Sequence, residues 1–189
     1  MPDRILTLGM IGSGRIARAH LKAAQNLAGH VRVAAIAGRR REKAEAAARD
    51  FGIPVVHDDH RRLLADPAVE GVIVTTPNDS HAAIVTDAAK AGKHVLVEKP
   101  MALDTPSAEG MVRAAEAAGV TLMVAQSRRF SDAVQTLVRR LPEIGEILRV
   151  HIVFCVAFRQ PPTDWWRSSA QAGGLVILLG VIVAVLPER

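Results

Sequence analysis

Apolar and polar positions alternate in blocks along the first two thirds of the chain, where short apolar runs are separated by alanine-rich segments. The apolar runs predict strands at Ile5–Ile11, Val31–Ala37, Val55–Val56, Gly71–Thr75, His94–Val97 and Val120–Val124. The segments between them predict helices near Ile16–Asn26, Glu42–Phe51, Asp59–Ala65, Ser80–Ala91 and Pro106–Ala118. Thr105 is the expected N-cap of the last of these helices, and Gly119 follows its end. The pattern predicts an α/β fold, a doubly wound parallel sheet with helices on both faces.

The pattern changes after about Ala125. A helix is predicted over residues 131–141 and a long strand over residues 147–158, as in the opening of an α+β domain. We therefore expect a first domain over residues 1–124 and an incomplete second domain over residues 125–189.

Composition narrows the classes of function. The formal net charge is +5, but the basic residues are scattered, the longest cluster is Arg39–Arg41, and the chain has no tyrosine. A stacking surface for bases is missing, so no nucleic-acid partner is expected. The one cysteine, Cys155, excludes an internal disulfide and favours a reducing compartment, so we expect a cytoplasmic protein.

Two further site classes are not expected. The apolar run Leu175–Leu186 has 12 residues, whereas a membrane-spanning helix needs about 20, so no membrane association is predicted. No spacing of His, Cys and Asp residues is typical of a metal site, so no metal is predicted.

A glycine motif follows the first predicted strand and opens the first predicted helix. It consists of Gly12, Ser13, Gly14, Arg15, Ile16 and Ala17. Gly12 allows a tight turn, Gly14 lets a pyrophosphate approach the backbone, and the helix N-terminus offers N–H groups to the anion. In this strand–turn–helix context the motif predicts a Rossmann dinucleotide site, with Gly12 to Ile16 as cofactor-binding residues. The alternatives are an ordinary glycine turn or another adenine-containing ligand.

The end of the second predicted strand bears on the choice of cofactor. An NAD site usually has an acidic residue there to hold the ribose hydroxyls, but this strand leads into Gly38, Arg39 and Arg40. Gly38 leaves room for a 2′-phosphate, and an arginine can pair with that phosphate. These residues favour NADP over NAD. The alternative is a solvated basic turn at the start of the next helix.

Four more groups of residues follow later strands or lie beyond them. They are Thr75-Thr76-Pro77-Asn78 with His81, Glu98-Lys99-Pro100, Gln126 with Arg129, and Trp166-Arg167. Together with the glycine motif, these groups and their spacing resemble the glucose–fructose oxidoreductase / inositol dehydrogenase (Gfo/Idh/MocA) family. The resemblance covers about residues 4–174, and Glu98-Lys99-Pro100 is its most specific part.

The resemblance implies a two-domain oxidoreductase that moves hydride between a nicotinamide and the hydroxyl-bearing carbon of a sugar or cyclic polyol. It implies that Lys99 is catalytic, at the reacting hydroxyl. It also implies cofactor-side contacts from Thr75, Thr76, Pro77, Asn78, His81, Glu98, Lys99, Gln126, Arg129, Trp166 and Arg167. A lysine beside a hydroxyl can lower the hydroxyl pKa or relay its proton, which makes the role chemically sound.

Two of these residues have structural alternatives. Lys99 could instead be a structural partner of Glu98, and His81 could cap backbone groups at a helix start. His57, His60 and His94 have no matching role and are expected at the surface or in packing.

The sequence departs from the family pattern near its end. The family has an Asp and a His facing the substrate where this chain has Leu178 and Ile182. Three interpretations are open: a truncated, impaired member; a member that uses Lys99 alone and is completed by another chain; or a cofactor-binding sensor or interaction protein. Because residues 147–158 and 175–186 are apolar, we also expect a homo-oligomer formed through the C-terminal region.

Overall fold

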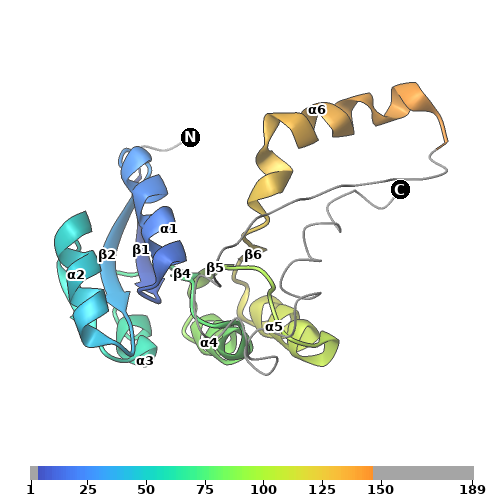
Figure 1. The fold of residues 1–189 in the computed structure, drawn as a ribbon. Helices are drawn as coiled ribbons and strands as arrows, with labels where there is room; N and C mark the ends of the chain where they lie inside the picture. Colours follow the sequence, from blue (N-terminus) through green and yellow to red (C-terminus); the bar gives the residue numbers. More distant parts are fainter. Residues whose placement is uncertain (1–3, 147–189) are drawn as a thin grey trace, which may run out of the picture.

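The computed structural model describes residues 4–146, and its centre is one parallel sheet (Figure 1). The sheet has six strands in the order β3-β2-β1-β4-β5-β6. The strands are β1 (Leu6–Ile11), β2 (Val31–Ala37), β3 (Val55–His57), β4 (Gly71–Val74), β5 (His94–Val97) and β6 (Leu122–Val124). This order, with neighbouring strands parallel throughout, is that of a Rossmann fold and confirms the predicted α/β class.

Helices connect the strands and cover both faces of the sheet. They are α1 (Arg15–Asn26), α2 (Arg41–Phe51), α3 (His60–Leu64), α4 (His81–Lys90) and α5 (Thr105–Ala118). One core layer joins α1 and α2 to the sheet through Met10, Leu21, Ile36, Ala47 and Ile73. The other joins α3, α4 and α5 to it through Ile11, Leu63, Val72, Val85, Val97 and Met111. Since neighbours such as Met10 and Ile11 enter different layers, the strands are buried on both faces.

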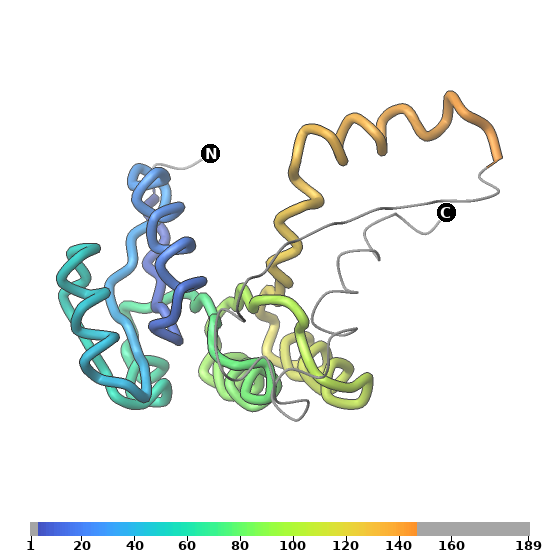
Figure 2. Tube along the Cα trace, in the orientation of Figure 1, coloured from blue at the N-terminus to red at the C-terminus, as the bar shows by residue number. Residues whose placement is uncertain are grey.

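The elements after β6 leave the sheet. A short helical turn η2 (Ser127–Phe130), the helix α6 (Asp132–Arg140) and the turn η3 (Leu141–Ile144) follow in order. Figure 2 shows this orange segment extending away from the sheet, and α6 has no buried residue. The predicted domain boundary after residue 124 stays a prediction. The predicted strand over 147–158, the apolar run 175–186, Cys155, Trp166, Arg167, Leu178 and Ile182 lie outside the described residues.

One capping prediction is wrong. Asp104, not Thr105, is the N-cap of α5, and its carboxylate accepts a hydrogen bond from the Ser107 N–H at 2.8 Å. Thr105 is therefore the first residue of the helix and Pro106 the second. A carboxylate at this position both accepts the N–H and carries a charge that the helix dipole favours. The predicted glycine end is confirmed, since Gly119 has a φ of 65°.

His81 is the buried polar residue that links two loops at the carboxyl edge of the sheet. It is fully buried, with Nδ1 2.9 Å from the carbonyl oxygen of Pro100 and Nε2 2.9 Å from that of Thr76. A neutral ring has one N–H and can donate to one of these carbonyls at a time. Burial lowers the pKa of His81 below its ordinary value of 6.5, and this outweighs the carbonyl contacts, which favour the charged ring.

This pKa predicts a loss of stability on acidification. Below about pH 6.5 the unfolded chain binds a proton at His81 that the folded chain does not, so the free energy of unfolding falls. One proton accounts for at most about 1.4 kcal/mol per pH unit. Urea denaturation at about pH 7.5 and about pH 5.5 should show that the free energy of unfolding falls more between these pH values in wild type than in His81→Gln. The exposed His30→Gln should keep the wild-type slope, and equal slopes for wild type and His81→Gln would contradict a buried neutral ring.

Candidate functional site

The glycine turn after β1 forms where two strands come close together. Gly12 has a φ of 113°, which a residue with a side chain rarely adopts. A Cβ placed on Gly12 would lie 2.6 Å from Thr75 Oγ1 and 2.9 Å from the Thr75 carbonyl. The Thr75 N–H donates to the carbonyl of Ile11 at 2.8 Å, which holds the end of β4 against β1. Position 12 therefore has room for glycine alone.

The start of α1 is open to an anion. Gly14 is the N-cap of this 12-residue helix, no side chain caps it, and the first turn contains no acidic residue. A Cβ placed on Gly14 would meet nothing within 4 Å, and Arg15 and Ile16 are exposed. Ala17 is fully buried in the core layer between α1 and the sheet. The free N–H groups and the positive end of the helix dipole thus face open space beside the glycine turn.

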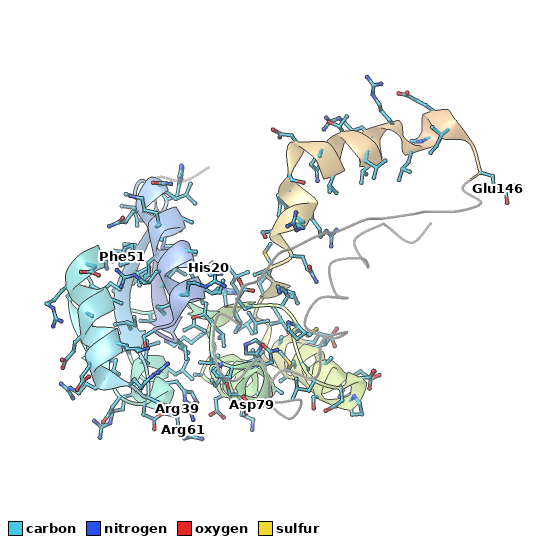
Figure 3. The ribbon with its side chains drawn as sticks, in the orientation of Figure 1. His20, Arg39, Phe51, Arg61, Asp79 and Glu146 are labelled. Atoms are coloured by element: carbon cyan, nitrogen blue, oxygen red, sulfur yellow. The ribbon has the colours of Figure 1, made fainter. Side chains whose placement is uncertain are left out.

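The end of β2 lies directly beside this turn. A Cβ placed on Gly38 would lie 2.9 Å from Ser13 Oγ and 3.3 Å from Ser13 Cβ. The Ser13 side chain therefore covers the place that a longer residue at position 38 would need. Arg39 and Arg40 follow and are exposed, and Figure 3 labels Arg39. The structure thus brings Gly38, at the end of β2, next to Ser13 of the glycine motif, while cofactor contacts from Arg39 and Arg40 stay a prediction.

The loop after β4 is held by its own polar groups. Thr75, Thr76 and Pro77 are half-buried, and Asn78 is buried at the start of the turn η1 (Asn78–Ser80). Ser80 Oγ lies 2.8 Å from Thr76 Oγ1 and 2.7 Å from the Pro77 carbonyl oxygen. His81 follows at the start of α4, with both ring nitrogens beside backbone carbonyls. This arrangement favours the backbone-holding alternative for His81, while contact with a cofactor stays a prediction.

The Glu98-Lys99-Pro100 turn follows β5, the strand next to β4. The Glu98 N–H donates to the Val74 carbonyl at 2.9 Å, and the Lys99–Pro100 peptide is cis. One carboxylate oxygen of Glu98 accepts a hydrogen bond from the main-chain N–H of Lys99 at 3.1 Å. The other lies 2.8 Å from Nε2 of His20, on α1. The turn is thus anchored to β4 through its backbone and to α1 through a side chain.

Sequence reasoning missed His20. The histidine lies 78 residues from Glu98, and no local motif links them. The available signal was its place on α1, three residues after the buried Ala17 and next to the buried Leu21. A polar residue on the inward side of a helix needs a partner, and that requirement could have marked it.

Gln126 and Arg129 lie beside the Glu98-Lys99-Pro100 turn, the lysine turn. Both line a pocket that is also lined by Pro100 and Met101, after β5, and by residues of α5 and β6. This pocket adjoins the site on the side of the sheet edge. The remaining predicted contacts, Trp166 and Arg167, lie outside the described residues.

These elements meet where the strand order of the sheet reverses. The chain leaves β1 toward β2 on one side, and β4 lies on its other side. In open α/β sheets, ligands bind outside the carboxyl ends of the strands at such a point. The glycine turn, the Thr75–Asn78 loop and the lysine turn all lie there. Within residues 4–146, no cluster of His, Cys, Asp and Glu could hold a metal, and no helix is long and apolar enough to cross a membrane.

Comparison with known proteins agrees with this geometry. Residues 6–126 match the model of a family described as oxidoreductases with an NAD-binding Rossmann fold. D-xylose 1-dehydrogenase (NADP(+)) 2 of Haloferax volcanii is 34% identical over 78% of this chain and 46% of its own. Inositol 2-dehydrogenase of Rhizobium meliloti is 32% identical over 85% of this chain and 48% of its own.

A solved structure agrees as well. Levoglucosan dehydrogenase in complex with NADH and levoglucosan superposes with a TM-score of 0.73 at 33% identity, over 77% of this chain and 42% of the other. The chain spans about half the length of the curated relatives that it matches. From the match over residues 6–126 and the Rossmann sheet that carries it, the chain belongs to the Gfo/Idh/MocA family of oxidoreductases.

Proposed function

We propose that this chain binds NADP(H) and carries the cofactor half of an oxidoreductase that acts on a hydroxyl carbon of a sugar or cyclic polyol. The observation that carries the proposal is the glycine turn at the strand-order reversal. Gly12 is sterically obligatory there, and the uncapped start of α1 faces open space. A pyrophosphate fits such a place because backbone N–H groups and the helix dipole both attract an anion.

The residues at the end of β2 favour the 2′-phosphate of NADP over the free ribose hydroxyl of NAD. A side chain at position 38 would collide with Ser13, so a carboxylate cannot stand there unless Ser13 moves. The exposed Arg39 and Arg40 follow Gly38 directly and supply positive charge at the end of β2. An arginine can pair with a phosphate through two parallel N–H groups. One relative is named for NADP(+) and another is solved with NADH. The proposed preference for NADP therefore rests on the residues at the end of β2.

The lysine turn supplies the chemistry of the reacting hydroxyl. The bound nicotinamide would accept the hydride from carbon, or return it in the reverse direction. Lys99, at the reacting oxygen, would stabilise the negative charge that develops there and relay the hydroxyl proton to water. Thr76, Pro77 and Asn78 would contact the cofactor beside it, with Gln126 and Arg129 lining the cleft. The sugar or polyol class follows from the names of the relatives.

Two glycine variants test the cofactor site. Gly12→Ala should lower both the melting temperature and the affinity for NADPH, because the added Cβ meets the Thr75 backbone. Gly14→Ala should keep the wild-type melting temperature, since its Cβ has free space and its φ is −82°. It should still lose about tenfold or more in NADPH affinity, because the methyl group occupies the path of the pyrophosphate. Wild-type affinity in Gly14→Ala would refute the pyrophosphate assignment.

Arginine variants test the cofactor preference. Fluorescence titration should show NADPH binding about tenfold or more tightly than NADH. Arg39→Ala should remove most of that difference by weakening the binding of NADPH alone, since NADH lacks the 2′-phosphate. Arg49→Ala, an exposed arginine in the last turn of α2, is the matched control and should leave both affinities unchanged. Equal affinity of wild type for the two nucleotides would contradict the preference.

A lysine variant separates an enzyme from a binding protein. With NADPH and a panel of keto-sugars, wild type should oxidise the nucleotide, and Lys99→Ala should lower the rate by about 10²–10⁴. The affinity of Lys99→Ala for NADPH should fall by a much smaller factor than the rate. Binding without any turnover in wild type would favour a non-catalytic sensor or interaction protein instead.

A further inference from the structure

The contact between His20 and Glu98 joins two parts of the site that the sequence keeps far apart. His20 lies in the second turn of α1, the helix that the glycine turn opens, and Glu98 begins the lysine turn. Figure 3 labels His20 on the side of α1 that faces the middle of the sheet. At an axial rise of about 1.5 Å per residue, His20 lies about 8 Å along α1 from its first residue.

Both carboxylate oxygens of Glu98 are engaged. Oε1 lies 2.8 Å from His20 Nε2, and Oε2 accepts the main-chain N–H of Lys99 at 3.1 Å. The two side chains are largely buried, with exposed fractions of 20% for His20 and 19% for Glu98. Both contacts restrict the carboxylate, because a largely buried oxygen that loses its partner has little water to replace it.

Through the Glu98 carboxylate, this arrangement links α1 to the backbone of Lys99. The Glu98 backbone is fixed by its hydrogen bond to the Val74 carbonyl, and the Glu98 carboxylate is held by the two contacts above. On the other side, the Pro100 carbonyl is held by His81. Removing the His20 bond frees the carboxylate to rotate away from the Lys99 N–H, and the lysine loses one of its backbone restraints.

We propose that His20 is a positioning residue for the lysine turn: it fixes the Glu98 carboxylate, which in turn orients Lys99. The proposal rests on the proposed function for its catalytic consequence. In this proposal the N-terminus of α1 binds the pyrophosphate, and His20 in the same helix orients Lys99 through Glu98. His20 acts through Glu98 and has no assigned contact with cofactor or substrate.

Amide hydrogen exchange tests the geometry without any cofactor. In the full chain, His20→Leu should speed exchange at the Lys99 amide by about tenfold or more, because its acceptor is no longer held. His20→Gln retains an N–H donor and should stay within about threefold of wild type. In a Glu98→Ala background, His20→Leu should cause no further increase in the exchange rate of the Lys99 amide. The exposed His30→Leu should behave as wild type.

Two results would overturn the proposal. One is wild-type exchange at Lys99 in His20→Leu. The other is an equal increase at Val95 and Val97 in β5, because that reports general loosening of the sheet.

Kinetics provide the second readout. His20→Leu should lower kcat about tenfold and leave the affinity for NADPH within about threefold, with kcat largely restored in His20→Gln. An unchanged kcat in His20→Leu would contradict the catalytic consequence. If wild type fails to bind NADPH, the proposed function fails, while the Lys99 exchange rates still decide the role of His20.

Discussion

The close approach of β1 and β4 at their carboxyl ends is the constraint on which the site depends. Thr75 donates to Ile11 there, and the space that is left next to Thr75 accepts only a glycine at position 12. The chain turns there before α1 begins, and its N-cap Gly14 has no side chain that could cap the helix start. A buried parallel sheet, packed on both faces, keeps this spacing fixed. Strand packing thus explains the glycine at position 12, and Gly14 leaves the helix start open to an anion.

The loops around the turn are cross-linked by side chains from other elements. His81 contacts the backbone of both the Thr75–Asn78 loop and the lysine turn, and His20 contacts the Glu98 carboxylate at the start of that turn. The lysine turn is therefore held from α4 on one side and from α1 on the other. In the proposed function such restraints would matter for hydride transfer, because small errors in the placement of reacting groups cost large factors in rate.

Local patterns in the sequence were enough to predict the sheet and the glycine turn. The bounds of β2 and β5 match their apolar runs, because a charged or glycine residue closes each of them. β6 is shorter than its apolar run: the Val120 N–H donates to the end of α5 and the Thr121 N–H donates to His94. The cap of α5 was misplaced by one residue because Asp104 and Thr105 are both good caps. The pairing of His20 with Glu98 depends on the placement of α1 across the sheet, which no local pattern contains.

The central claim is that the glycine turn and the basic end of β2 together hold NADPH. Mapping amide chemical shifts of the ¹⁵N-labelled chain on addition of NADPH tests it most directly. The account predicts that the largest changes fall on residues 12–16 and 38–40, with smaller ones at 76–78 and 98–99. Changes confined to the pocket beside α5 and β6, or no changes at saturating NADPH, would contradict it.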